Sequence, residues 1–220
     1  MSVKTASKTR TLVILAMLCA MAFILTAVGR IPVVLFLKYD PKDIVIAIGG
    51  FLFGPLAALS VTVVTSIVEM LTLSDTGVIG LVMNILSSAS FACIAAAIYQ
   101  KKRTMRGALA GLAVGIVSMT AIMLLWNYLI TPLYMHVERA QVAALLVPAF
   151  LPFNLVKGFL NAAATLLLYK PVVSGLTRAH MIAPSAPSGM QKKNHIAIVC
   201  AAAFVIATCV LCILAMQGKL

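Results

Sequence analysis

The stretch LPFNLVKGFLN, residues 151–161, decides how the rest of this chain is interpreted. It belongs to an apolar run, residues 143–169, that is long enough to cross a bilayer. Asn154, Lys157 and Asn161 follow one another at spacings of three and four residues, which places them on one face of a helix. Because a lysine inside hydrocarbon is costly, we expect this face to point at water, a partner side chain or a ligand.

The composition is that of an integral membrane protein. Of the 220 residues, 63% are hydrophobic and 10% are charged, and the mean hydropathy is +1.11, whereas soluble domains carry about 25% charged residues. The net charge of +12 comes from short basic segments between apolar runs, such as residues 101–106. This distribution is typical of cytoplasmic loops and argues against nucleic-acid binding.

The apolar segments predict an all-α integral membrane protein, a six-transmembrane-helix bundle followed by a seventh, C-terminal transmembrane helix. We divide the chain into a membrane domain at 1–173, a polar cytoplasmic linker at 174–194 and the additional helix at 195–217. The expected helices lie at about 12–29, 44–53, 56–71, 78–99, from 107 onward, 143–169 and 195–216.

The basic segments also predict the orientation of these helices. Positively charged loops stay on the cytoplasmic side, which places the N-terminus, residues 101–106 and residues 176–193 inside. The loops at 38–43, 74–77 and 136–141 are then outside.

The loop after the first helix combines an apolar part, VVLFL at 33–37, with the charged sequence KYDPKD at 38–43. The charged part can serve simply to solvate an external turn. The apolar part, however, would not face water unaided, so we expect the loop to fold back over the outer mouth of the bundle.

Four polar side chains are expected at a similar depth in the outer half of the membrane. At a rise of 1.5 Å per residue, Asn84, Asn127, Asn154 and Lys157 come from three helices and reach comparable levels. We interpret them as the lining of one outward-facing chamber. The alternatives are separate packing roles and an ion pair between Lys157 and Glu69.

The residue types of this chamber limit its ligand. Asparagine both donates and accepts hydrogen bonds, and a single lysine without an arginine pair matches a phosphate or dicarboxylate poorly. Trp126, Tyr128 and Phe153 offer flat apolar faces, although aromatic residues at the membrane interface explain the first two equally well. A neutral molecule with a conjugated ring and several hydroxyl groups would fit.

Sequence motifs for catalysis are missing from the chain. It contains no G-x-x-x-x-G-K-[ST], no H-E-x-x-H and no G-x-S-x-G, and its cysteines and histidines lack the spacing of metal ligands. We therefore expect no catalytic residues and no metal site.

Two faces of small residues predict close helix packing. Ala16 and Ala20 are four residues apart, and Gly107, Gly111 and Gly115 form a doubled GxxxG pattern. The alanine face serves either a partner protein or ordinary packing within the chain.

Several short motifs occur together in a characteristic order. They are FLKYDPKDI at 36–44, FGPLA at 53–57, GVIG at 77–80 with Asn84, NY at 127–128 before PLY at 132–134, and PFNLVKG at 152–158. Over about residues 10–172 this set resembles the substrate-binding subunits, or S components, of energy-coupling factor (ECF) vitamin transporters, specifically the riboflavin type.

The resemblance implies a prokaryotic cell-membrane protein whose outward pocket is closed by the loop after the first helix. It implies that Asn127, Asn154 and Lys157 match flavin-contacting positions. We also expect ligand contacts from Asn84 and from the loop and aromatic residues Leu37, Tyr39, Asp40, Trp126, Tyr128 and Phe153.

The same resemblance implies partners. Ala16 and Ala20 match a face that contacts the membrane coupling subunit, which works with two ATPase subunits. Riboflavin is then the cargo, and no cofactor is expected. Two alternatives stay open: an S component for another vitamin or precursor, and a structural or assembly protein of the membrane.

Overall fold

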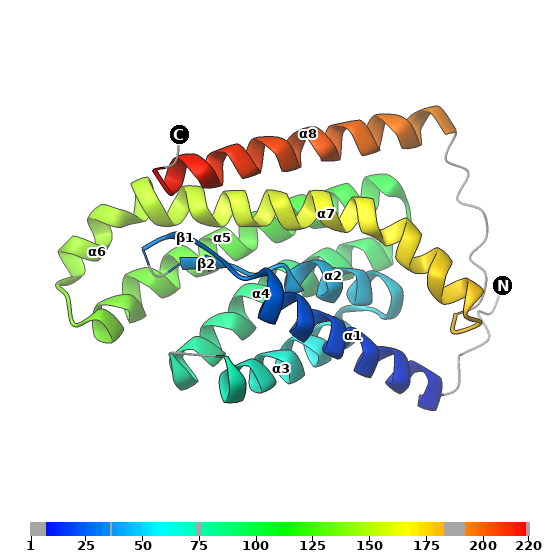
Figure 1. Ribbon diagram of the computed structural model, residues 1–220, viewed down its shortest axis with the longest axis horizontal. Coiled ribbons are helices and arrows are strands. Elements are labelled where there is room, and N and C mark those ends of the chain that lie inside the picture. Colours follow the sequence, from blue (N-terminus) through cyan, green and yellow to red (C-terminus); the bar gives the residue numbers. More distant parts are fainter. Residues whose placement is uncertain (1–7, 36, 74–75, 183–191, 219–220) are drawn as a thin grey trace.

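The protein is an elongated bundle of helices with one small β-hairpin (Figure 1). The computed structural model describes residues 8–35, 37–73, 76–182 and 192–218. The elements are α1 (Lys8–Gly29), β1 (Ile31–Val34), β2 (Leu37–Tyr39), α2 (Lys42–Phe53), α3 (Pro55–Thr72), α4 (Gly77–Lys101), α5 (Met105–Met135), α6 (Arg139–Leu145), the π-helix η1 (Leu146–Phe150), α7 (Leu151–Arg178) and α8 (Lys192–Met216).

The seven predicted helices are confirmed, with ends that differ by a few residues. The clearest difference is in the helix predicted at 143–169. Its first part is formed by the end of α6 and by η1, and α7 continues to Arg178, so the first five residues of the predicted linker are helical. Residues 183–191 of that linker lie outside the described residues, as do Ser74 and Asp75 of the predicted turn before α4.

Six segments are long and apolar enough to cross a membrane: α1, α3, α4, α5, the continuous stretch Arg139–Arg178, and α8. The exception among the predicted helices is α2, whose 12 residues span only about 18 Å. Ten of these twelve residues are buried, because α1, α3, α4 and α7 surround the helix. A helix that is apolar almost all round belongs in such a position.

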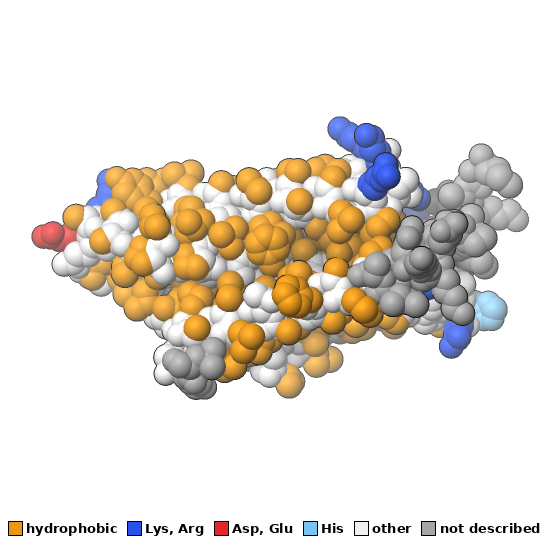
Figure 2. Space-filling model, turned by 90° about the horizontal axis from the view of Figure 1, so that it is seen from above, with side chains coloured by type: hydrophobic (Ala, Val, Ile, Leu, Met, Phe, Trp, Pro, Cys, Tyr) orange, Lys and Arg blue, Asp and Glu red, His pale blue; other side chains and the backbone are white. Residues whose placement is uncertain are grey.

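The outer surface of the bundle is apolar over most of its length. Figure 2 shows hydrophobic side chains covering the middle of the molecule, with the charged side chains near its two ends. Large side chains such as Val28, Leu56 and Phe204 are between 74% and 84% exposed. A soluble monomer rarely exposes such a surface, whereas lipid covers it readily.

The glycine face of α5 packs against α4, as its spacing predicts. A Cβ atom added to Gly111 would lie 2.6 Å from the carbonyl oxygen of Ala95, and one added to Gly115 would lie 2.7 Å from that of Phe91. Only glycine allows the two backbones to approach this closely.

The alanine face of α1 is exposed. The buried side chains of this helix are Ile14, Leu18, Ala22 and Thr26, which follow one another at intervals of four residues. Ala16 and Ala20 lie on another side and are exposed. Packing within the described part of the chain therefore does not explain their spacing.

The loop after α1 folds back as a two-stranded antiparallel hairpin, in which Ile31 lies opposite Tyr39. Val33, Leu37 and Tyr39 are buried in an apolar cluster with Phe150 and other residues of the helices. The predicted fold-back is confirmed. The strands themselves were not predicted, because three or four residues carry too little alternation to indicate a strand.

Candidate functional site

The junction between the hairpin and α2 carries charges into the interior. Asp40, Lys42 and Asp43 are 5%, 1% and 0% exposed. The interpretation that this charged segment only solvates an external turn is wrong for these three residues. Asp43 lies in the first turn of α2, where the helix dipole favours a negative charge.

Glu69 of α3 joins the first half of this charged interior. Its carboxylate accepts hydrogen bonds from Arg30 Nη2 and Lys42 Nζ, and from Asn84 Nδ2 at 3.0 Å. Arg30 also donates to both oxygens of Asp40, at 2.7 and 3.4 Å. The arginine after α1 is thereby tied to the hairpin and to α3.

Asp43 joins the second half. Its carboxylate accepts hydrogen bonds from Ser88 Oγ at 2.5 Å and from Asn161 Nδ2 at 3.2 Å. Lys157 Nζ lies 3.2 Å from the same carboxylate and donates to Ser87 Oγ at 3.0 Å. These contacts join α2, α4 and α7.

Tyr39 links the hairpin to α7. Its hydroxyl donates to Asn161 Oδ1 at 2.8 Å. Burial raises the pKa of the Tyr39 hydroxyl, so this group stays neutral and remains a donor at physiological pH.

We call six charged residues, five of them buried and Arg30 half-buried, the ionic cluster: Arg30, Asp40, Lys42, Asp43, Glu69 and Lys157. Three acids and three bases have a formal charge sum of zero. Burial of ions is tolerated when each is paired and hydrogen-bonded, and every member of this cluster has an oppositely charged partner within 3.2 Å.

The predicted alternative of an ion pair between Lys157 and Glu69 is wrong. The N-terminus of α2 supplies a closer partner to each residue, since Lys42 pairs with Glu69 and Asp43 pairs with Lys157. Lys157 is nevertheless a paired side chain, and any ligand that takes its ammonium must compete with Asp43 and Ser87.

The two other predicted amides are buried and bond to residues one helical turn away along the chain. Asn127 Nδ2 donates to the carbonyl of Met123 at 2.7 Å, and Asn127 Oδ1 accepts from Thr131 Oγ1 at 2.9 Å. Asn154 Nδ2 donates to the carbonyl of Phe150 at 2.8 Å. Phe150 ends the π-helix η1, a type of irregularity that is frequent at functional sites.

A cavity of about 180 Å³ lies between the N-terminal end of α4 and the C-terminal end of α5. We call it the outer cavity, after the predicted orientation of the chain. Of the three predicted aromatic contacts, only Trp126 lines it. Tyr128 is 37% exposed and carries the Arg139 guanidinium 5.6 Å above its ring, while Phe153 is buried in the apolar cluster with Leu37. The lining residues are Lys38, Thr76, Ile79, Gly80, Met83, Trp126, Ile130, Thr131 and Tyr134.

Several members of the charged interior were not among the predicted site residues: Arg30, Lys42, Asp43, Ser87, Ser88 and Asn161. A signal existed for Asn161, which shares its helix face with Asn154 and Lys157. Another existed for Glu69, because an intramembrane carboxylate requires a basic partner. Nothing in the local sequence distinguishes Lys42 and Asp43 from ordinary loop charges.

Residues 10–169 match the family model described as the ECF transporter, substrate-specific component. This chain belongs to that family. It is thus the substrate-binding membrane subunit of an ECF transporter, in agreement with the resemblance seen in its motifs.

Curated relatives of this S component carry the name riboflavin transporter. RibU of Staphylococcus aureus (strain TCH60) is 31% identical over 177 residues, which cover 76% of this chain and 92% of the relative. FmnP of Bacillus subtilis (strain 168) is 29% identical over 190 residues, which cover 79% and 99%. RibU of Streptococcus thermophilus is 28% identical over 184 residues, which cover 78% and 87%.

A solved structure has the same fold. It is described as the S component of a bacterial ECF transporter, with a TM-score of 0.66 and 30% sequence identity. The match covers 99% of that chain and 77% of this one.

The ionic cluster generates a stability prediction. Glu69→Gln keeps the size of the side chain but leaves Arg30 and Lys42 with one acidic partner, Asp40. Breaking a buried pair costs about 3–5 kcal/mol, so we expect a clearly lower unfolding temperature of the detergent-solubilised protein.

The control is Glu138→Gln, which neutralises an exposed carboxylate before α6 and should leave the unfolding temperature unchanged. Equal unfolding temperatures for the two variants would contradict a structural role of the Glu69 contacts.

Proposed function

We propose that this S component captures riboflavin from outside the cell for ATP-driven uptake by partner subunits and performs no chemistry itself. The observation that carries the proposal is the similarity to three riboflavin transporters over 87–99% of their own lengths. The outer cavity supports it, since Thr131 lines this cavity and is hydrogen-bonded to the buried Asn127.

The residue chemistry suits this ligand. Riboflavin is neutral at physiological pH and combines a conjugated ring system, with donors and acceptors along one edge, with a hydroxylated chain. Asn127 and Asn154 each donate and accept, and Lys157 donates. Trp126, which lines the outer cavity, offers a flat face for a ring.

Binding requires the cavity to grow. Its volume of about 180 Å³ is below the roughly 300–1,000 Å³ of small-molecule pockets. The hairpin is the element that can open the site, because it closes onto α7 through the hydrogen bond from Tyr39 to Asn161. If Lys157 turns to the ligand, Asp43 keeps its hydrogen bonds from Ser88 and Asn161.

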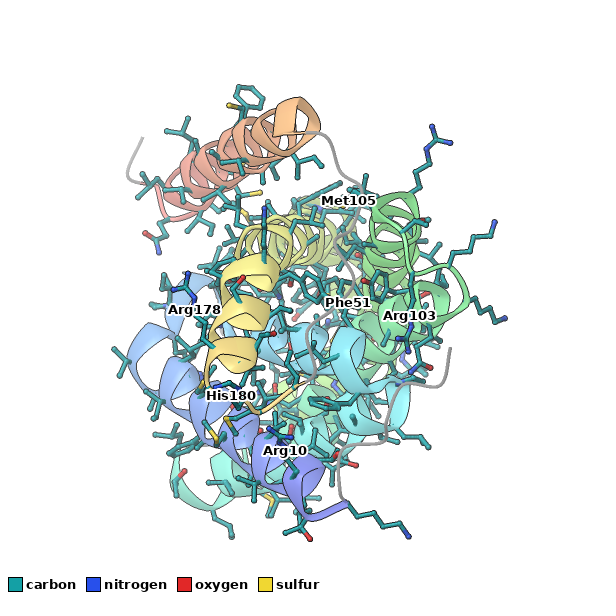
Figure 3. All side chains as sticks on the ribbon, turned by 90° about the vertical axis from the view of Figure 1, so that its right-hand side faces the viewer. Arg10, Phe51, Arg103, Met105, Arg178 and His180 are labelled. Carbon is teal, nitrogen blue, oxygen red and sulfur yellow. The ribbon has the colours of Figure 1, made fainter. Side chains whose placement is uncertain are left out.

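The proposed orientation places the N-terminus in the cytoplasm. Arg10, Arg103 and Arg178 gather at one end of the bundle (Figure 3), and positive residues favour the cytoplasmic side. The hairpin follows α1 at the other end, where it meets the external medium. Phe51, Tyr99 and Tyr169 pack against one another with ring centroids 4.5–6.2 Å apart and close the cytoplasmic end of the interior.

The transport energy comes from partners in this proposal. The sequence has no phosphate-binding loop, so ATP hydrolysis belongs to the ATPase subunits and reaches this subunit through a membrane coupling subunit. The exposed alanine face of α1 is the proposed docking surface. An S component for another vitamin is the second candidate, because one fold accommodates different ligands through its pocket side chains.

Lys157→Met tests the ligand site. Losing a hydrogen bond in a buried site costs about 1–3 kcal/mol, so riboflavin affinity should fall roughly 5- to 150-fold. The measurement is quenching of riboflavin fluorescence by the purified protein, with folate and thiamine as competing ligands that should not displace riboflavin.

The control variant combines Lys157→Met with Asp43→Asn, which removes both charges of the pair. This double variant should regain thermal stability without regaining affinity. Riboflavin binding by Lys157→Met at wild-type affinity would place the ligand elsewhere and leave Lys157 a purely structural role.

Ala16→Trp tests the docking surface. Close helix approach tolerates alanine but not bulk, so uptake of riboflavin by cells should be lost while the purified variant still binds riboflavin. The control is Ala203→Trp on the exposed side of α8, which should leave uptake intact. Normal uptake by Ala16→Trp would rule out this face of α1.

A further inference from the structure

The last helix, α8, extends beyond the part of the chain that defines the family. The family model ends at residue 169, whereas α8 begins at Lys192. The solved S component is covered over 99% of its length by only 77% of this chain. The role of α8 must therefore be derived from its own contacts.

One side of α8 packs along α7, and its C-terminal end reaches β1 (Figure 1). Ala202, Cys209 and Ile213 are 5–7% exposed and follow one another at spacings of seven and four residues, which defines a single stripe. Phe204 and Leu211 on the other side are 74% and 56% exposed. This helix thus has one lipid-facing side and one side committed to the protein.

The C-terminal part of this stripe belongs to the apolar cluster that contains the hairpin residues. Cys209 and Ile213 belong to the same buried apolar cluster as Val33 and Leu37 of the hairpin and Phe153 of α7. Helix α8 therefore helps to cover the residues with which the hairpin closes onto the bundle.

A hydrogen bond also joins the C-terminal end of α8 to the hairpin. Gln217 Nε2 donates a hydrogen bond to the carbonyl oxygen of Pro32 in β1 at 2.5 Å. A two-stranded sheet leaves backbone groups along its edges without a partner in the sheet, and the Pro32 carbonyl lies at an exposed position. Gln217 supplies that partner to the hairpin directly.

We propose that α8 is a built-in brace that holds the β1–β2 hairpin closed and thereby slows the entry and release of the ligand. The effect on ligand exchange rests on the proposed function, in which the hairpin closes a binding site. The brace itself rests only on the contacts of α8 with β1 and the apolar cluster.

The brace affects how fast the ligand enters and leaves rather than which side chains contact it. Among the described residues, no member of α8 lines the outer cavity or belongs to the ionic cluster. Helix α8 also lies across the bundle from α1, as Figures 1 and 3 both show. It therefore leaves the alanine face of α1 free for the coupling subunit.

The test uses the full chain in lipid nanodiscs and compares three variants with the wild type. Ile213→Ala with Gln217→Ala removes the apolar and the polar contact, while Leu211→Ala shortens an exposed side chain of the same helix. Gln217→Ala alone is the milder variant, because it changes a residue past the end of α8.

The first measurement is hydrogen exchange of the backbone amides in residues 31–39. In Gln217→Ala, loss of the hydrogen bond should speed hydrogen exchange roughly 2- to 12-fold. The double variant should show a larger increase than Gln217→Ala, and Leu211→Ala should exchange at the wild-type rate. Unchanged exchange in the double variant overturns the brace, whether or not any ligand binds.

The second measurement is the dissociation rate of riboflavin in stopped-flow fluorescence. Riboflavin should dissociate faster from the double variant, by a factor similar to the increase in hydrogen exchange of the hairpin amides. Faster hydrogen exchange with an unchanged dissociation rate of riboflavin would overturn the proposal that α8 slows ligand entry and release. A wild-type chain that does not bind riboflavin refutes the proposed function instead, and hydrogen exchange still decides the brace.

Discussion

The rest of the structure depends on the neutralisation of six charges, of which five are buried and one, that of Arg30, is half-buried. Glu69 pairs with Arg30 and Lys42, and Asp43 pairs with Lys157, so each ion brought into the bundle meets its counter-ion. An unpaired ion at this depth would cost several kcal/mol. The same pairs fix the hairpin, the short buried helix α2, and helices α3 and α7 relative to one another.

The sequence predicts the helices well because their signals are local. Apolar runs of membrane length, the Gly54–Pro55 break and the basic segment at 101–106 each indicate a boundary without knowledge of the fold. The pairing within the ionic cluster, in contrast, is not set by local sequence. The sequence supplies the charged residues, but their pairing depends on where the first turn of α2 lies in the bundle. For this reason Lys157 pairs with Asp43 rather than with Glu69.

The burial of the predicted polar side chains is confirmed, but their contacts include residues that were not predicted. Asn127, Asn154 and Lys157 are buried as expected, since polar residues in apolar helices point inward. Tyr128 and Phe153 lie away from the outer cavity, because aromatic residues pack equally well at an interface or in a core. Asn161 and Ser88 take part through their contacts with Asp43, which only the assembled structure reveals.

In the proposed function, the ligand competes with Asp43 and Ser87 for the ammonium group of Lys157. An experimental structure of the protein with riboflavin tests it most directly. The account predicts the flavin beneath the hairpin, in contact with Lys157 Nζ, while Asp43 keeps Ser88 and Asn161. A bound flavin with the 3.2 Å contact between Lys157 and Asp43 intact and no contact to Lys157 would contradict it.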